Sequence, residues 1–159
     1  MVIPSFIGQA LSDKEITVLG DGEQTRCFCH VKDVVWALAN IIQCPEAMGR
    51  VITIGNDEEI SINRLAQRVK EIIGSNSPII NIPYEEAYTE GSEDMVRRVP
   101  DLALAYQLIG FRPVRTLDDI ILDVIQYARE KDAKGPSLKG RNKMGKRGGS
   151  LGITARSVN

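Results

Sequence analysis

The sequence is poor in the residue types that build metal sites, disulfide frameworks and membrane spans. It holds three cysteines, one histidine and one tryptophan among 159 residues, and aromatic residues make up 5% of the chain. An odd cysteine count without a repeating framework favours a reducing compartment, which predicts a cytoplasmic protein. The N-terminal stretch MVIPSFIGQAL has neither a basic start nor a long apolar run, so we expect no signal peptide and no membrane contact.

The cysteines and the histidine gather in the stretch GDGEQTRCFCHVKD, residues 20–33, but their spacing does not suit a metal site or a catalytic pair. Cys27 and Cys29 would point to one face of a strand, and no C-x-x-C pair is present to close a tetrahedral zinc site. His30 would point to the face opposite Cys29, which argues against a cysteine–histidine nucleophile. We therefore predict no metal ligand here, with both cysteines facing the core or an interface, and His30 structural or facing a substrate.

The sequence also lacks a dinucleotide-binding loop. No G-x-G-x-x-G run follows a strand and opens a helix, and the GDG of residues 20–22 is too short to cradle a phosphate, so it predicts a turn. Gln24 and Arg26 then share one face of the following strand. An arginine among largely apolar neighbours needs an anionic partner or a path to water, and a bidentate guanidinium suits a phosphate.

Charge divides the chain into two parts. Residues 1–132 carry 13 basic and 21 acidic side chains, whereas residues 133–159 carry seven basic side chains and no acidic one. Because the C-terminal stretch also lacks aromatic residues and apolar periodicity, we predict a folded region at 1–131 and a disordered basic tail at 132–159. Seven scattered charges do not indicate nucleic-acid binding, and we interpret the tail as a solvated extension or a stretch outside the natural gene product.

Short helices and strands alternate through residues 1–131, which predicts a mixed α/β fold. Helical apolar spacing, alternating β-branched segments and turn residues mark the elements. Ser61 and Gly74 are expected to cap one helix, and Thr116 with Asp119 forms a predicted capping box. The expected strands are 15–20 and 25–31, joined as a hairpin, then 50–55 and 77–84; the expected helices are 4–11 after an extended start, 33–42, 62–73, 101–110 and 117–132.

A second basic pair, Arg97 and Arg98, follows an acidic loop. The neighbouring acids Glu93, Asp94 and Asp101 allow ordinary surface ion pairs, which contribute little to stability. Composition alone does not decide whether Arg97 and Arg98 form such surface ion pairs or bind an anionic ligand.

Four stretches, taken in order, are similar to the C-terminal half of extended short-chain dehydrogenases/reductases: VIPSFIGQAL, ITVLGDGEQTRCFCHVKDVVWAL, VITIGNDEEISINRLAQRV and EDMVRRVPDLALAYQLIGFRPVRTLDDIILDVIQY. The chain resembles in particular the NAD-dependent sugar-nucleotide epimerases and dehydratases, the group of UDP-glucose 4-epimerase and UDP-glucuronate decarboxylase. The resemblance covers about residues 1–130. It implies the C-terminal part of an NAD(P)-binding Rossmann-type fold, without the N-terminal dinucleotide-binding half.

This resemblance implies a binding site for a nucleotide-diphosphate sugar, with UDP-sugars as the expected ligands. Arg26 matches the family arginine that grips the diphosphate from a G-x-G-x-Q-x-R-x-F hairpin. A second arginine closes on the same diphosphate, and Arg98 matches it best, with Arg97 as the alternative. Asp94 matches an acidic position near the ribose. The remaining implied contacts, along the base and ribose and beside the first arginine, are Val2, Ile3, Pro4, Phe6, Gln24 and Phe28.

The family's redox chemistry requires more than this site. It uses NAD, a glycine motif and a Tyr-x-x-x-Lys pair whose tyrosine exchanges the proton. We expect this chain to lack that catalytic half, to hold no catalytic residue and to be inactive alone, with NAD bound in the complete family enzyme and not by this chain by itself. One binding position also departs from the family pattern, since Glu90 stands where epimerase-like members often have arginine.

The resemblance also implies an incomplete surface. In the family, the strand that corresponds to residues 50–55 pairs with the sheet of the missing half, so alone it would expose an edge and an apolar face. We therefore predict a partner chain that supplies the missing half, a homo-oligomer, or a truncated gene product. Two functions remain open: the substrate-binding portion of an epimerase, dehydratase or decarboxylase, and a non-catalytic module for nucleotide-sugar binding or assembly.

Overall fold

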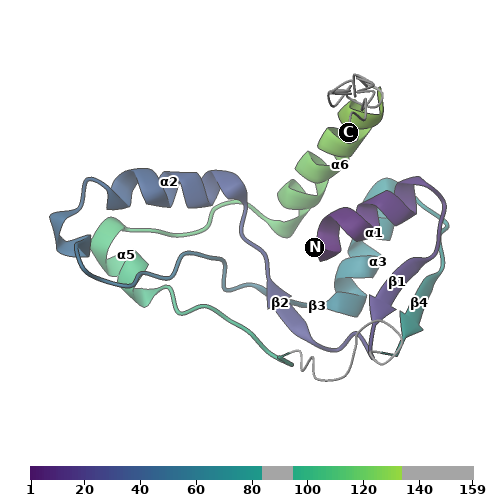
Figure 1. Ribbon diagram of the computed structural model, residues 1–159, viewed down its shortest axis with the longest axis horizontal. Coiled ribbons are helices and arrows are strands. Elements are labelled where there is room, and N and C mark those ends of the chain that lie inside the picture. Colours follow the sequence, from purple (N-terminus) through teal and green to yellow (C-terminus); the bar gives the residue numbers. More distant parts are fainter. Residues whose placement is uncertain (84–94, 134–159) are drawn as a thin grey trace, which may run out of the picture.

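The structure is a computed structural model that describes residues 1–83 and 95–133 (Figure 1). It confirms the mixed α/β class. The predicted disorder of the tail falls outside the described residues from position 134 onward, whereas residues 132 and 133 belong to the last helix. The elements are α1 (Val2–Leu11), β1 (Ile16–Leu19), β2 (Thr25–Cys27), α2 (Val31–Ile41), the short 3-10 helix η1 (Pro45–Ala47), β3 (Glu59–Ser61), α3 (Ile62–Ile73), β4 (Ile79–Ile82), α5 (Ala103–Ile109) and α6 (Leu117–Ala133).

The larger core lies where α1, α3 and α6 pack together beside β1 and β4 (Figure 1). Each of these helices buries one apolar stripe, as the helical spacing of its apolar residues predicts. We call this part of the molecule the core region. Its buried residues are Ile3, Phe6, Ile7, Ala10, Ile16, Val18, Ile62, Leu65, Ala66, Val69, Ile121 and Ile125.

Helix ends in the core region follow the predicted capping residues. The Ser61 Oγ accepts a hydrogen bond from the Arg64 N–H at 3.2 Å, and Gly74 ends α3 in the left-handed conformation with φ of 72°. The Thr116 N–H donates to the Asp119 Oδ2 at 2.8 Å, which confirms the capping box before α6. Ahead of α1 the expected extended start is wrong, because the helix already begins at Val2 and the missing N–H of a proline costs nothing in a first turn.

The predicted hairpin between residues 15–20 and 25–31 is wrong. β1 pairs in parallel with β4, and β2 pairs antiparallel with β3, so neither strand pairs with the other. The cause is the GDG turn, which docks on α3: the Gly22 carbonyl accepts from the Asn63 N–H at 3.0 Å, and the Gln24 carbonyl accepts from the Ile62 N–H at 3.1 Å. These carbonyls satisfy N–H groups that the first turn of a helix leaves unpaired.

A smaller apolar cluster joins α2 to α5 (Figure 1). Ala37, Ala105 and Phe111 are its buried members, and Ile52 and Ile54 pack against it. We call this part the α2–α5 region. The strand expected at 50–55 is absent, because no described strand pairs with these residues, although they follow α2 and η1 as the β-branched pattern placed them.

Among the helices of residues 1–83 and 95–133, none combines the length and the hydrophobicity needed to cross a bilayer.

Candidate functional site

The structure brings the two arginine-bearing stretches side by side. The Thr25 N–H donates to the Val96 carbonyl at 2.9 Å, and Thr25 forms a parallel bridge with Arg97. Residues 95–97 therefore run along one edge of β2, while β3 pairs with the other edge. Segments that are about seventy positions apart in the sequence thus form one narrow ladder, which we call the arginine ladder.

Arg26 fastens this ladder from β2. Its Nη1 donates to the Thr25 carbonyl at 2.7 Å and to the Met95 carbonyl at 2.8 Å, and its side chain is half-buried. The backbone contacts fix where the guanidinium lies. A cation that is oriented in advance loses less conformational entropy when it binds an anion than a freely rotating one does.

Arg97 lies on the same face of the ladder as Thr25 and is held by β3. Its Nε donates to the Glu59 Oε2 at 3.0 Å, and its Nη2 donates to the Glu59 Oε1. The Thr25 Oγ1 donates to the same carboxylate at 2.9 Å. The hydrogen bonds from Arg97 and then from Thr25 hold the pKa of Glu59 below its usual value, and the bond to Glu59 raises the pKa of Arg97. This bidentate pair matches the surface-ion-pair alternative for one of the two arginines.

Arg98 follows on the other face. Neighbouring residues of an extended segment alternate between faces, so the Thr25–Arg97 bridge places Arg26 and Arg98 together on the face opposite Glu59. Arg98 is exposed, and no described residue forms an ion pair with it. The geometry therefore divides the basic pair: Arg97 braces the ladder, and Arg98 is the arginine that shares a face with Arg26.

The other predicted contact residues have different surroundings. Ile3 and Phe6 are buried in the core region, Val2 and Phe28 are half-buried against it, and Pro4 is exposed. Val2, Ile3 and Phe6 tie the start of α1 to the core. The predicted contacts of all five residues with a base or ribose stay predictions.

Two polar predictions remain to be placed. Gln24 is buried, and its Nε2 donates to the Leu19 carbonyl at 3.1 Å, so this amide links the end of β1 to the turn before β2. Asp94 lies outside the described residues.

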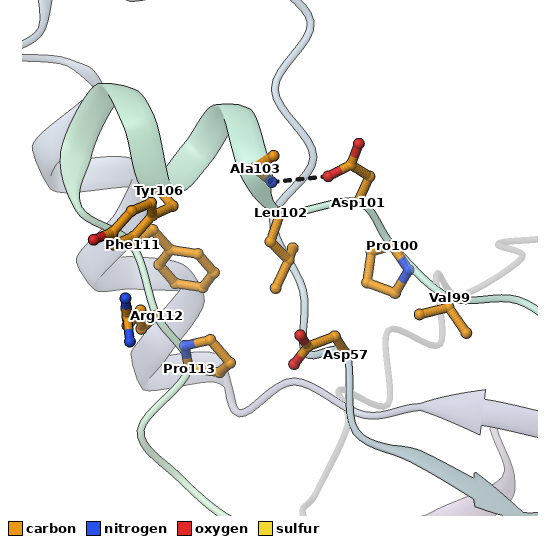
Figure 2. A pocket seen from close by; sticks show the side chains of 10 residues that line it. All are labelled: Asp57, Val99, Pro100, Asp101, Leu102, Ala103, Tyr106, Phe111, Arg112 and Pro113. Carbon is orange, nitrogen blue, oxygen red and sulfur yellow. Dashed lines mark hydrogen bonds between the residues drawn. The ribbon is translucent and has the colours of Figure 1, made fainter.

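A cleft of about 630 Å³ opens directly after the arginine pair (Figure 2). Figure 2 shows apolar side chains in the middle of the cleft, the Asp101 and Asp57 carboxylates toward one side and the Arg112 guanidinium toward the other. The Asp101 Oδ1 accepts from the Ala103 N–H at 2.9 Å, and the Arg112 guanidinium lies 4.6 Å from the centre of the Tyr106 ring. The lining residues are Asp57, Val99, Pro100, Asp101, Leu102, Ala103, Tyr106, Phe111, Arg112 and Pro113.

Sequence reasoning did not single out Asp57, Tyr106 or Arg112. They come from separate stretches of the chain, and no local spacing pattern links them. These residues surround one cleft only because α5 packs against α2 and against the segment that follows α2. The position of Asp101, just after the arginine pair, could have indicated a residue of the site. The sequence pattern was interpreted only as a surface ion pair.

His30 has a structural role, one of the two alternatives left open for it. Its buried ring caps α2, because Nδ1 accepts from the Lys32 N–H at 3.1 Å while Nε2 lies 3.0 Å from the Asp123 Oδ2 of α6. The hydrogen bonds of Lys32 and His30 hold the pKa of Asp123 below its usual value. Both ring nitrogens are thus occupied by structural contacts.

The cysteines behave as partly buried thiols. β2 ends at Cys27, so Cys29 lies beyond the strand. Cys29 packs against the cluster of the α2–α5 region. Burial raises the pKa of both thiols, and the carboxylates of Glu59 and Asp57 add to the effect at Cys27. Thiols with raised pKa values are poor nucleophiles at neutral pH.

The expected absence of a Tyr-x-x-x-Lys spacing is wrong, because Tyr127 and Lys131 stand four positions apart in α6. Tyr127 is exposed, and the C-terminal end of α6 projects away from β2 and β3 (Figure 1). This pair therefore lies far from the arginine ladder. The spacing alone does not make it the redox pair, which in the family acts beside bound NAD.

Comparison with known proteins finds one family of similar sequences and structures. Residues 1–55 match the model of the NAD dependent epimerase/dehydratase family. A UDP-N-acetyl-alpha-D-glucosaminuronate decarboxylase from Bacillus cytotoxicus is 36% identical over 129 residues, which are 81% of this chain and 40% of the relative. UDP-glucuronic acid decarboxylase 1 from Xenopus tropicalis is 34% identical over 82% of this chain and 29% of its own length.

A solved structure agrees with these sequence matches. The UDP-glucuronic acid 4-epimerase from Bacillus cereus, in complex with UDP-glucuronic acid and NAD, superposes with a TM-score of 0.72 at 25% identity, covering 82% of this chain and 40% of that one. These matches confirm the predicted resemblance to the NAD-dependent epimerase/dehydratase family and the Rossmann-type fold class. The chain spans about two fifths of the length of the Bacillus relatives.

Proposed function

We propose that this chain is the nucleotide-sugar-binding portion of an NAD-dependent sugar-nucleotide epimerase, dehydratase or decarboxylase, and that Arg26 and Arg98 hold the diphosphate. The Thr25–Arg97 bridge carries the proposal, because it puts Arg26 and Arg98 on one face of the ladder. The names of the relatives support the ligand class, since they act on UDP-sugars and one was solved with UDP-glucuronic acid.

The charges of the ladder suit a diphosphate. On one face, Glu59 neutralises Arg97 and leaves no net charge. On the other face, the Arg26 and Arg98 guanidinium groups stand on adjacent segments, and a planar guanidinium suits a phosphate because its fork matches two phosphate oxygens. The sugar or the nucleoside attached to the diphosphate would then extend toward the cleft that begins at Val99.

NAD would supply hydride transfer in a complete enzyme, but the described residues of this chain do not fit it. In the GDG turn, a Cβ built on Gly22 would lie 2.1 Å from the Asn63 Oδ1, so that side chain already covers the glycine. No open phosphate cradle remains there, and we assign the chain binding and positioning of the substrate only.

A calorimetric titration with UDP-glucuronic acid tests the clamp. Arg26→Ala and Arg98→Ala should each weaken binding by roughly 1.5–3 kcal/mol, the usual worth of a hydrogen bond to a charged group. Arg129→Ala, which removes an exposed guanidinium on α6, is the matched control and should leave binding nearly unchanged. Absence of UDP-sugar binding, or equal effects of all three variants, would contradict the clamp.

The second function, a non-catalytic module that binds nucleotide sugars or assists assembly, is favoured by one observation, the closed GDG turn. An NAD titration and a UDP-sugar turnover assay on this chain mixed with an NAD-binding half distinguish the two. Turnover in the mixture supports the enzyme portion, whereas UDP-sugar binding without turnover supports the module.

A further inference from the structure

Arg98 depends on a short backbone contact for its place in the arginine ladder. The Thr25–Arg97 bridge and the hydrogen bond from the Thr25 N–H to the Val96 carbonyl pair this segment with β2. So short a ladder is marginally stable unless side chains support it. The position of Arg98 is therefore set by the side chains that fasten residues 95–97 to β2.

Arg26 fastens this segment on the face that we assign to the diphosphate. Its Nη1 donates to the Met95 carbonyl at 2.8 Å. In the proposed function Arg26 thus has two tasks, because the same guanidinium holds the segment and binds the ligand. A phosphate that draws this guanidinium outward weakens its contact with Met95. A second fastening, which does not take part in ligand binding, is needed to keep Arg98 in place.

Glu59 provides that fastening on the opposite face. It stands opposite Cys27 in the β2–β3 pair, so its side chain shares a face with Thr25 and Arg97. Its carboxylate accepts hydrogen bonds from the Thr25 Oγ1 at 2.9 Å and from the Arg97 Nε at 3.0 Å. The Arg97 Nη2 completes the bidentate pair. This single carboxylate therefore ties β3, β2 and residues 95–97 together.

We infer that Glu59 is a positioning residue for UDP-sugar binding, because through Arg97 it fixes the segment that presents Arg98 beside Arg26. This inference rests on the proposed function. Arg98 follows Arg97 directly, so a shift of the Arg97 backbone also moves the Arg98 guanidinium. A guanidinium that is held in place in advance loses less conformational entropy when it binds an anion. A negatively charged side chain thereby favours the binding of a negatively charged ligand.

This role predicts an effect opposite in sign to that of simple charge repulsion. A carboxylate near a diphosphate repels it, so its removal would strengthen binding if charge alone mattered. Glu58 provides the comparison, because it is exposed one position before Glu59 and forms no ion pair with another described residue. Glu59→Gln and Glu58→Gln each remove one negative charge from the same short stretch, but only the first removes the contact with Arg97.

A calorimetric titration with UDP-glucuronic acid compares these two variants. Glu59→Gln should lower the affinity by about two- to tenfold, the usual cost of ordering one long side chain on binding. Glu58→Gln should leave the affinity unchanged or raise it. Circular dichroism checks that both variants are folded. An affinity of Glu59→Gln equal to or above that of wild type overturns the inference.

Exchange of the two charges provides a rescue. Glu59→Arg adds positive charge near the proposed diphosphate site but breaks the ion pair with Arg97. The double variant Glu59→Arg with Arg97→Glu restores the net charge of wild type and an ion pair across β2. Positioning predicts that the double variant binds UDP-glucuronic acid more tightly than Glu59→Arg alone. The reverse order contradicts the inference, because charge attraction alone favours the single variant.

Hydrogen exchange at Thr25 separates this inference from the clamp. The Thr25 N–H is bonded to the Val96 carbonyl, so its exchange without ligand reports the stability of the ladder. Glu59→Gln should accelerate this exchange by about two- to fivefold, the usual worth of one exposed ion pair, and Glu58→Gln should not. Unchanged exchange in Glu59→Gln overturns the inference even where the clamp holds.

Failure of the clamp gives a different result. In that case Arg26→Ala and Arg98→Ala bind UDP-glucuronic acid as wild type does, and the role of Glu59 in binding fails with the clamp, although Glu59→Gln still accelerates exchange at Thr25.

Discussion

The core region and the α2–α5 region differ in how much of their apolar surface they bury themselves. The core region encloses twelve buried apolar residues from three helices and one strand, whereas the α2–α5 region encloses three. The arginine ladder lies between them, with β3 running into α3 and residues 95–98 leading toward α5 (Figure 1). Because burial of apolar surface stabilises a fold, we expect the core region to be the more stable of the two.

Truncation of a core side chain should produce the largest effect. Leu65 is fully buried in α3, so Leu65→Ala should lower the free energy of unfolding by about 2–5 kcal/mol. Leu38 lies on the exposed side of α2, so Leu38→Ala should change this free energy by about 0.5 kcal/mol or less. Urea titration followed by far-ultraviolet circular dichroism measures both. If both variants lost a similar free energy of unfolding, the exposed side of α2 that carries Leu38 would have to be covered in the isolated chain.

An intermediate effect is expected from the buried carboxylate of the α2–α5 region. Asp33 accepts hydrogen bonds from the Val114 and Arg115 N–H groups at 3.3 and 3.1 Å, and from the Arg115 guanidinium. Asp33→Asn should destabilise this region by about 1–3 kcal/mol, because an amide leaves part of this donor set unsatisfied.

Fluorescence of Trp36, the single tryptophan, isolates that effect. Its ring lies 6.3 Å from the Phe111 ring, inside the α2–α5 region. The fluorescence transition of Asp33→Asn should move to lower urea while the main dichroism transition moves less. Asp57→Asn, which changes an exposed carboxylate, is the control. Coincident shifts by both probes would show that the two regions unfold as one.

The smallest effect should come from an ion pair on the surface of the core region. The Arg68 guanidinium holds the pKa of Asp118 below its ordinary value. A depressed folded-state pKa contributes stability that is present above the unfolded-state value near 4 and is lost as the pH falls through the folded-state value. At pH 7 the free energy of unfolding of wild type should thus exceed that of Asp118→Asn by about 0.2–1 kcal/mol. The two free energies should converge as the pH falls.

Urea titrations between pH 7 and pH 2 measure this convergence. Asp13→Asn, which changes a carboxylate outside the described ion pairs, should leave a difference from wild type that does not follow the same pH range. A constant gap between wild type and Asp118→Asn at all pH values would show that the carboxylate acts through shape and not through charge.

Local signals in the sequence predicted local structure well. The caps at Ser61 and Gly74 and the Thr116–Asp119 box depend on residues within one helical turn, and all three are confirmed. The hairpin failed because the partner of β1 lies about sixty positions away and the GDG turn binds the first N–H groups of α3. No short pattern encodes either contact.

The residue types of the candidate site could be predicted from the sequence, but their arrangement in space could not. Arg26 and the later arginine pair stood out as cations, and the resemblance set them around one ligand. Arg97 and Arg98 lie on different faces because Thr25 pairs with Arg97, and Arg97 binds Glu59 across β2. Both are long-range contacts. The strand expected at 50–55 has an alternating side-chain pattern along residues 51–54, but pairing also requires a neighbour that these residues do not have in the described structure.

Ser61 has a consequence for how the site responds to its surroundings. It is both the last residue of β3, opposite Thr25, and the N-cap of α3, so the strand that carries Glu59 and the central helix of the core region are one unbroken piece. Through β3, the strand that pairs with Thr25 and Arg26 is thus joined directly to the central helix of the core region, so the position of the arginine ladder is set by the larger of the two apolar cores.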